Sequence, residues 1–142
     1  MTESLESPVR RLEGAALPDW VARLDRTAFG SVWKAPAAHE ALWVVPEVAF
    51  ARWSRVPAAG EAELLRIAVD PAHRGEGLGR ALLEACQRDL AAEGLIRLFL
   101  EVRVSNTAAI RLYRACGWEP CGLRPRYYTD GEDAALYQRM SL

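Results

Sequence analysis

A short segment, Arg74 to Gly79, has the pattern Arg-x-x-Gly-x-Gly and holds three glycines. The run before it, Leu64 to Val69, is apolar and is stopped by Asp70-Pro71, which predicts a buried strand. A helix is expected to begin near Leu78. Glycine lets the backbone approach a ligand closely, and the first N–H groups of a helix have no intrahelical partner and carry its positive dipole end. The segment therefore predicts a binding site for a phosphate or pyrophosphate.

Spacing excludes two other phosphate-binding motifs. A Walker loop needs Lys-Ser or Lys-Thr after its last glycine, whereas Gly79 is followed by Arg80-Ala81, so nothing would hold magnesium. A Rossmann fingerprint reads Gly-x-Gly-x-x-Gly after the first strand; here the spacing differs and about half of the chain comes first. A tight strand-to-helix turn without a ligand stays the alternative interpretation.

Glu101 lies inside a strongly apolar run, Leu98 to Val104, whose side chains alternate. The alternation places residues 98, 100, 102 and 104 on one face of a strand and Glu101 on the other, beside Phe99 and Arg103. On the residues alone, the simplest interpretation is a partly exposed glutamate whose charge is offset by Arg103.

The second half of the chain resembles a known family. Residues 74–79 resemble the acetyl-coenzyme A pyrophosphate loop of the GNAT N-acetyltransferase superfamily. The segment 100–118 is similar to the family pattern of a strand with a Glu followed by a helix, with these residues in register: Asn106, Ala109, Leu112, Tyr113, Gly117 and Trp118. The tail resembles the bacterial ribosomal-protein alanine N-acetyltransferases through Arg124, Arg126, Tyr127, Tyr128 and the run 130–134. The resemblance covers residues 61–142.

This resemblance implies an α+β fold, the GNAT fold: a mixed, mostly antiparallel sheet with helices on both faces and acetyl-CoA in the cleft after the fourth strand. The coenzyme-binding residues that it implies are Ile67, Ala68, Val69, Arg74, Gly75, Glu76, Gly77, Leu78, Gly79, Arg80, Asn106 and Tyr113. A backbone N–H within 67–69 is expected to stabilise the oxyanion that forms on the thioester. Glu76 departs from the family, which often has a basic or neutral residue there, and its carboxylate is expected to point to solvent.

The resemblance also implies the catalytic groups. It makes Glu101 the general base and Tyr113 the general acid toward the departing thiolate, although core packing alone would also explain Tyr113. The nucleophile must be a neutral amine, and an α-amino group, with a pKa of about 8 against about 10.4 for lysine, is the easier acceptor for a glutamate base. Tyr127 and Tyr128 are expected to line the acceptor peptide slot; ordinary turn residues are the alternative.

The elements that must hold these groups follow from periodicity and turn residues. Strands are expected at 9–13, 41–45, 48–56, 62–69, 98–104, 118–123 and 134–140, the second to fourth as an antiparallel meander and the last two as a hairpin. Helices are expected to begin at Pro18-Asp19, with Trp20, Val21, Leu24, Thr27 and Ala28 as the apolar face, and at Asn106, which is also a candidate cap. A further helix is expected to begin near Leu78, with Glu84 and Arg88 paired on its outer side and these residues on its apolar face: Leu78, Ala81, Leu82, Ala85, Cys86 and Leu90. Residues 31–39 are expected to form a loop.

Composition limits the class of protein. The 142 residues, 51% hydrophobic and 26% charged, suit one domain over 1–142, with residues 1–8 as a flexible arm. A net charge of −1 gives no overall basic field for nucleic acid or an anionic membrane, and no apolar run resembles a signal peptide or a membrane span. Three cysteines and two isolated histidines form neither a disulfide framework nor a metal site and favour the cytoplasm.

Together these observations predict transfer of an acetyl group from acetyl-CoA to a protein N-terminal α-amine, most simply the alanine of a ribosomal protein, without a metal. A lysine side chain or a small-molecule amine stays an alternative acceptor. A noncatalytic coenzyme A-binding module is an alternative of another class, against which Glu101 and Tyr113 argue.

Overall fold

The computed structural model describes residues 8–13, 16–34 and 36–141, so the predicted N-terminal arm lies, except for Pro8, outside the described residues. The strands are β1 (Arg10–Leu12), β2 (Glu40–Val45), β3 (Ala49–Val56), β4 (Glu61–Val69), β5 (Arg97–Arg103), β6 (Glu119–Arg124) and β7 (Ala134–Met140). The helices are α1 (Asp19–Phe29), α2 (Leu78–Ala92) and α3 (Thr107–Ala115), with short 3₁₀ turns at Pro57–Ala59 and Pro71–His73. No helix within these described ranges is long and apolar enough to span a membrane.

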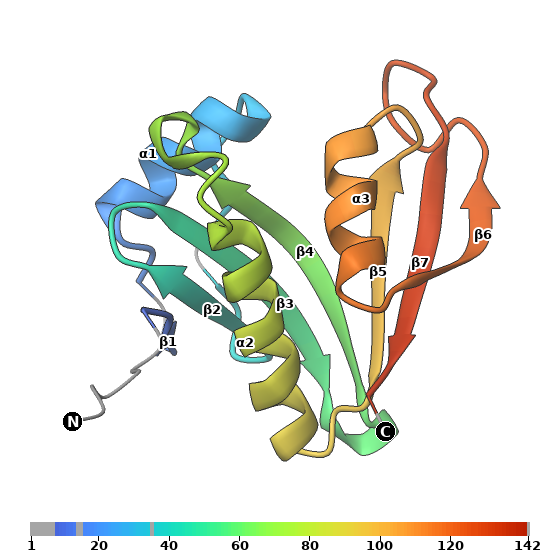
Figure 1. Cartoon of the computed structure of the whole chain (residues 1–142), viewed down its shortest axis with the longest axis horizontal. Helices are drawn as coiled ribbons and strands as arrows, with labels where there is room; N and C mark the ends of the chain where they lie inside the picture. Colours follow the sequence, from blue (N-terminus) through green and yellow to red (C-terminus); the bar gives the residue numbers. More distant parts are fainter. Residues whose placement is uncertain (1–7, 14–15, 35, 142) are drawn as a thin grey trace.

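The seven strands form one sheet in the order β1-β2-β3-β4-β5-β7-β6, and β4–β5 is its parallel pair (Figure 1). These two strands pair only from Glu61 opposite Arg97 to Leu64 opposite Leu100. Beyond that point they diverge, as Figure 1 shows, although β4 continues to Val69. The sheet is therefore split, and no strand within the described part of the chain pairs with the edges of β4 and β5 that face the split.

A β-bulge lies in β4 where the split begins. Arg52 of β3 is opposite Arg66, but Trp53, the next residue, is opposite Leu64, so Leu65 is an extra residue in β4. An extra residue bends a strand and reverses which face its later side chains occupy. Leu64 accordingly packs in the core under α2 and α3, whereas Ala68 packs under α1.

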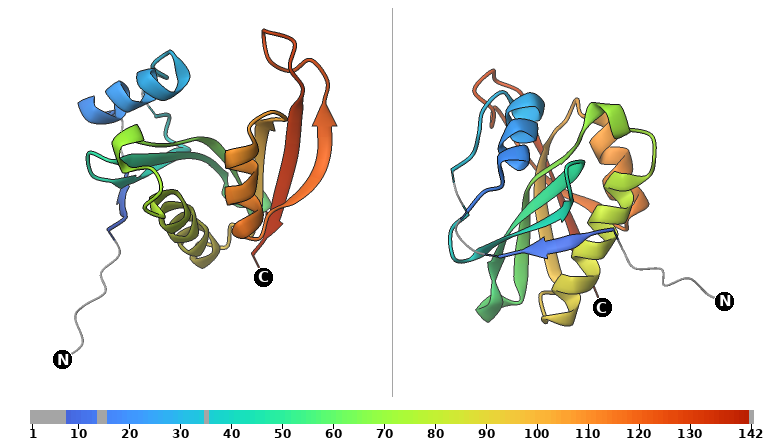
Figure 2. Two further views of the ribbon diagram at one scale, coloured as in Figure 1. Left: turned by 45° about the horizontal axis from the view of Figure 1, so that its top comes forward. Right: turned by 90° about the vertical axis from the view of Figure 1, so that its left-hand side faces the viewer.

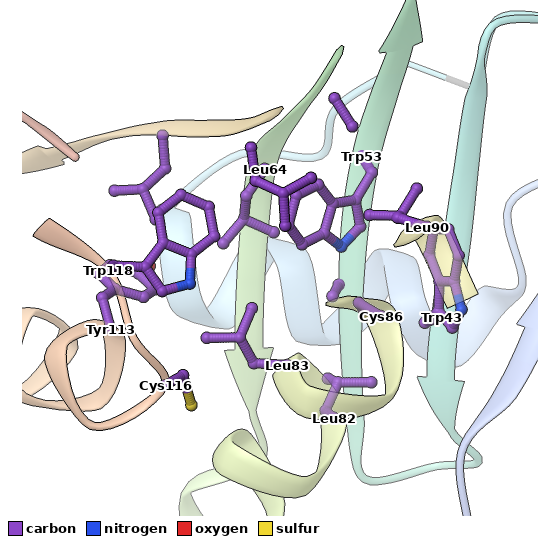
Figure 3. Packing of buried hydrophobic residues seen from close by; sticks show 14 of the residues in the cluster. Trp43, Trp53, Leu64, Leu82, Leu83, Cys86, Leu90, Tyr113, Cys116 and Trp118 are labelled. Atoms are coloured by element: carbon purple, nitrogen blue, oxygen red, sulfur yellow. The ribbon is translucent and has the colours of Figure 1, made fainter. Parts of the chain in front are cut away.

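Helices cover both faces of the sheet, with α1 on one face and α2 and α3 on the other (Figure 2). The larger core packs α2 against three tryptophans, Trp43, Trp53 and Trp118, which make a chain of ring contacts 6.3–6.5 Å between centroids (Figure 3). The smaller core places Val21 and Leu24 of α1 on β2 and β3. The architecture confirms the predicted mixed, mostly antiparallel sheet with helices on both faces.

Four details differ from the sequence predictions. Thr27 and Ala28, expected on the buried face of α1, are exposed, because the buried positions of that helix are Val21, Leu24 and Asp25. In α2 the buried side chains include Leu83 and Gln87, which the predicted stripe omitted; the amide of Gln87 accepts from Trp118 Nε1 at 2.7 Å. Glu84, expected to pair with Arg88, contacts Arg80 at 3.5 Å. Val104, expected to share the buried face of β5, lies beyond the end of that strand and is exposed.

The strand before the glycine segment is less buried than its apolar composition predicts. Leu65, Ile67 and Val69 are only half-buried. They lie beyond the last residue pair with β5, so one side of the strand faces the split instead of a neighbour. The partial exposure is a property of the cleft that these residues border.

Candidate active site

Three adjoining cavities lie along β4 and β5, two of them at the split and the third over the stretch in which the two strands pair. The loop cavity, of about 480 Å³, is lined by 67–69 of β4, by 73–75 and 77–80, and by the start of α3. The central cavity, of about 470 Å³, lies between 64–67 of β4 and 100–103 of β5. The hairpin cavity, of about 280 Å³, lies against the β6–β7 hairpin. The loop and central cavities share Phe29, Ile67 and Asn106, and the central and hairpin cavities share Leu100 and Glu101. Glu101 thus lies where the last two meet.

The glycine segment has the geometry that its sequence predicts. The Asp70 carboxylate accepts from the N–H of Ala72 at 2.9 Å and shapes the turn at the end of β4. Gly75 and Gly77 have φ of 83° and 76°, a region that favours glycine, and Gly77 directly precedes α2. The first N–H groups of α2 therefore open into the loop cavity, with Arg74 and Arg80 on its lining. This arrangement can bind an anionic group through the backbone.

Glu76 differs from its neighbours in this segment because it does not line the loop cavity. Its side chain is 54% exposed and contacts His73 Nδ1 at 3.4 Å. The carboxylate thus points to solvent, as expected, and Glu76 can act on a bound anion only through its charge.

Asn106 and Tyr113 reach the cleft from α3. The Asn106 side chain accepts from the N–H of Ala109 at 3.2 Å, so it caps the helix, and it also lines both the loop and the central cavity. Tyr113 packs against Trp118, with ring centroids 6.1 Å apart, and lines the central cavity. Burial, and to a lesser degree the charge of Tyr128, raises the pKa of Tyr113. Tyr113 therefore combines a core position with contact to the cleft.

The interpretation of Glu101 as a glutamate offset by Arg103 is wrong. Arg103 instead contacts Asp130 at 2.8 Å and Glu132 at 2.9 Å. Glu101 is on the face opposite the buried Leu98, Leu100 and Val102, as the alternation predicts, and its side chain is only 18% exposed.

The Glu101 carboxylate has unused hydrogen-bonding capacity. Its Oε2 is buried without a hydrogen-bond partner among the described residues, and its Oε1 lies 3.9 Å from Arg124 Nη2. An unpaired buried carboxylate oxygen is costly and uncommon in folded proteins. Because this oxygen belongs to a residue that lines two cavities, its arrangement suits a group that accepts a proton from a ligand.

The two predicted acceptor-slot tyrosines lie differently. Tyr128 lines the central cavity, and Arg103 stacks on its ring at 4.1 Å. Tyr127 is 49% exposed and lines none of the three cavities described above. The nearby Glu101 carboxylate is the main cause that raises the pKa of Tyr127, followed by burial. Tyr127 thus lies beside the carboxylate, and Tyr128 borders the cleft itself.

A network around Arg66 was missed by the sequence analysis. Arg66 lines the central cavity, donates to Asp25 Oδ1 at 2.7 Å, and lies between the rings of Phe29 and Trp33 at 4.6 and 4.7 Å. The N–H of Trp33 donates to Asp25 Oδ2 at 2.8 Å. The network fixes the end of α1 and the following loop onto β4. Its sequence signal is a charged residue, Asp25, on the apolar face of the predicted helix.

A sheet that splits between two parallel strands, with a glycine loop at the end of the first, defines the class of proteins with the GNAT fold. The model of the acetyltransferase (GNAT) family matches residues 9–118, and the chain belongs to this family. The match begins well before residue 61, where the resemblance in sequence begins, and it includes the glycine segment, Glu101 and Tyr113.

Known relatives match in structure and sequence. The crystal structure of the ribosomal-protein-S18-alanine N-acetyltransferase from Escherichia coli is similar with a TM-score of 0.75 and 31% identity, over 93% of this chain and 94% of that one. The curated [ribosomal protein bS18]-alanine N-acetyltransferase of E. coli K12 is 45% identical over 84 residues, 58% of this chain and 57% of that protein. An uncharacterized protein of Mycobacterium leprae is 54% identical over 80 residues, 56% of this chain and 21% of that protein. The sequence matches thus span from about a fifth to just over half of these curated relatives.

Proposed function

We propose that this chain transfers an acetyl group from acetyl-CoA to the α-amine of a protein N-terminus, acting in the cytoplasm on the N-terminal alanine of a ribosomal protein like bS18. The observation that carries the proposal is the position of Glu101, a carboxylate with a buried, unpaired oxygen where the central and hairpin cavities meet. The loop cavity lies at the other end of the same cleft and suits the pyrophosphate of the donor. The E. coli relatives, which are named for this activity, support the choice of acceptor.

Different residues of the cleft bind different parts of the donor. The N–H groups at the start of α2, with Arg74 and Arg80, hold the pyrophosphate. The edge of β4 along 67–69, which no strand covers, and Asn106 hold the pantetheine arm through amide hydrogen bonds. This edge also offers an N–H to the oxygen of the thioester carbonyl, where negative charge develops during attack.

Glu101 accepts a proton from the acceptor amine, and Tyr113 interacts with the departing sulfur. The acceptor enters with its α-ammonium next to Glu101, which takes one proton directly or through a water molecule. The neutral amine attacks the thioester carbonyl carbon and the C–N bond forms. The nitrogen then gives up its second proton, the C–S bond breaks, and the departing thiolate takes up a proton, which yields the N-acetylated acceptor and free coenzyme A. Tyr113 is placed to donate a hydrogen bond to that sulfur. Because burial raises the pKa of Tyr113, hydrogen bonding contributes more than full proton transfer.

Tyr113→Phe is accordingly expected to lower kcat by only about 3- to 10-fold. The substitution removes the hydroxyl and keeps the ring on Trp118, so the thermal transition should stay close to that of the wild type. The measurement is turnover at saturating acetyl-CoA and acceptor peptide, beside Glu101→Gln. A loss equal to or larger than that of Glu101→Gln would assign the main proton transfer to Tyr113 and contradict this division of roles.

Glu76→Gln is expected to tighten acetyl-CoA binding by about 2- to 3-fold at low salt, because it removes a negative charge near the pyrophosphate without touching the cavity lining. Calorimetry at low and at moderate ionic strength measures the effect, which should shrink with salt. Glu119→Gln removes a charge from the exposed strand β6 and serves as the control. Unchanged or weaker binding by Glu76→Gln would refute the expectation.

The proposed function is tested by mass spectrometry after incubation with acetyl-CoA and two peptides. One peptide has a free N-terminal alanine and no lysine, and the other has a blocked N-terminus and one lysine. Acetylation of the first alone, abolished in Glu101→Gln, is the expected result. Acetylation of the second alone would indicate a lysine acetyltransferase, and binding of acetyl-CoA without acetylation of either would indicate a small-molecule acceptor or a noncatalytic role.

A further inference from the structure

The hairpin cavity carries an excess of negative charge. Its lining includes three carboxylates, Glu61, Glu63 and Glu101, and one cationic side chain, Arg124. The other lining residues are mostly apolar, among them Phe99, and include the polar side chains of Ser54 and Tyr137. The cavity adjoins the central cavity at Glu101, at the opposite end of the cleft from the glycine loop. An acceptor whose amine lies at Glu101 therefore has this acidic cavity next to it.

Within this cavity, Glu63 lacks a partner. Glu63 is opposite Phe99 in the β4–β5 pairing, and Phe99 is two residues before Glu101 in β5. Among the residues that the structure describes, no cationic group lies within 4.0 Å of the Glu63 carboxylate. The single guanidinium, that of Arg124, is nearer to Glu101 at 3.9 Å. Burial and then the charge of Glu101 raise the pKa of Glu63, against the opposing charge of Arg124. The ligand-free cavity thus holds two carboxylates that repel each other, and a cation would relieve this repulsion.

We propose that Glu63 binds a cationic group that the acceptor carries close to its reacting amine, and that Glu63 thereby determines acceptor specificity. The inference rests on the proposed function and names the acceptor class more narrowly. Glu101 is about 7 Å along β5 from Phe99, the residue that pairs with Glu63, so the backbone positions of the two glutamates are far enough apart to serve two different cationic groups of one acceptor. A guanidinium or ammonium on the second or third acceptor residue spans that distance, with its aliphatic stem along Phe99. The N-terminal ammonium, bound on its way to Glu101, is the other source of the same charge.

The test uses two peptides that begin with alanine and contain no lysine. They differ only at the second and third residues, which are arginine in one peptide and citrulline, a neutral isostere, in the other. Wild-type enzyme is expected to show a kcat/KM about 10-fold higher for the arginine peptide, through KM. In Glu63→Gln this ratio should fall to about 1 to 2, while kcat for the arginine peptide and the affinity for acetyl-CoA stay near the wild-type values. Glu119→Gln, an exposed carboxylate outside the cavity, should keep the wild-type ratio.

The outcomes separate the possible sources of charge. An equal rise in KM for both peptides in Glu63→Gln would identify the N-terminal ammonium as the bound group and support a cation site at Glu63. Either of two results would overturn the proposal. In the first, the wild type shows a kcat/KM ratio near 1 for the two peptides and Glu63→Gln does not change KM. In the second, Glu63→Gln keeps the same kcat/KM ratio as the wild type. Because a carboxyl with a raised pKa destabilises the folded state when ionised, Glu63→Gln should be at least as heat-stable as the wild type at pH 7.

Calorimetry of both peptides in the presence of coenzyme A separates this inference from the proposed function. Suppose that neither peptide is acetylated but that the wild type, unlike Glu63→Gln, binds the arginine peptide more tightly than the citrulline peptide. This result would support the cation site and refute N-terminal transfer. If the wild type and Glu63→Gln both acetylate the two peptides equally well, the result would support N-terminal transfer and refute the cation site.

Discussion

Replacing Glu101 by glutamine is expected to lower kcat/KM for an N-terminal-alanine peptide by roughly 10³-fold at pH 7. Glutamine keeps the size of the side chain and removes its ability to accept a proton. At pH 7 about nine-tenths of an α-amine with a pKa of about 8 is protonated, so wild-type turnover depends on a base. Binding of acetyl-CoA should be unchanged, because Glu101 does not line the loop cavity.

The pH dependence gives this prediction a second readout. Between pH 7 and pH 9 the α-amine loses its proton to solvent, so the deficit of Glu101→Gln should shrink by about 10-fold. Initial rates with a thiol-specific assay, corrected for the pH response of the assay, measure both quantities. A deficit that stays constant over this range would mean that Glu101 orients the acceptor without accepting a proton.

The second large effect is expected from Gly77→Val, which should weaken acetyl-CoA binding by at least about 30-fold. Gly77 has φ of 76° directly before α2, where a β-branched residue is strained, and it lines the loop cavity beside the first N–H groups of the helix. The backbone has to rearrange, and the anion site is lost. Calorimetric titration with acetyl-CoA measures the effect.

Gly94 offers a matched control for that substitution. It follows the other end of α2 with φ of 82°, and at both glycines an added Cβ would meet no atom within 4 Å. Gly94→Val should therefore lower the thermal transition about as much as Gly77→Val does and leave acetyl-CoA binding intact. Equal losses of affinity in the two variants would show that the effect at Gly77 is one of general stability.

Local sequence patterns predicted the parts of the site that depend on neighbouring residues. The glycine segment combines three short-range signals, a strand stop at Asp70-Pro71, left-handed glycines and a helix start, and each acts within a few residues. The alternation in β5 likewise gave the face of Glu101 correctly. Such features need no knowledge of the rest of the chain.

The wrong or missing predictions depend on long-range geometry. On the residues alone, the closeness of Arg103 in sequence favoured it as the partner of Glu101, but Arg103 pairs with Asp130 and Glu132, which lie just before β7. The bulge at Leu65 has no local signature, yet it decides which face Arg66 occupies. The hairpin cavity combines β3 to β7, so no single segment indicates it.

The short pairing between β4 and β5 has a consequence for the molecule as a whole. The sheet consists of two halves, β1–β4 and β5–β7. The backbone pairing between these halves covers four residue pairs of β4 and β5. The loop cavity is lined by both halves, by β4 from one and by α3 from the other. The coenzyme proposed for the loop cavity would therefore contact both halves and add cohesion that a continuous sheet would otherwise supply. A ligand present at 100 times its Kd adds about 2.7 kcal/mol to the free energy of unfolding, so we expect the donor to stabilise the two halves against each other as well as to react.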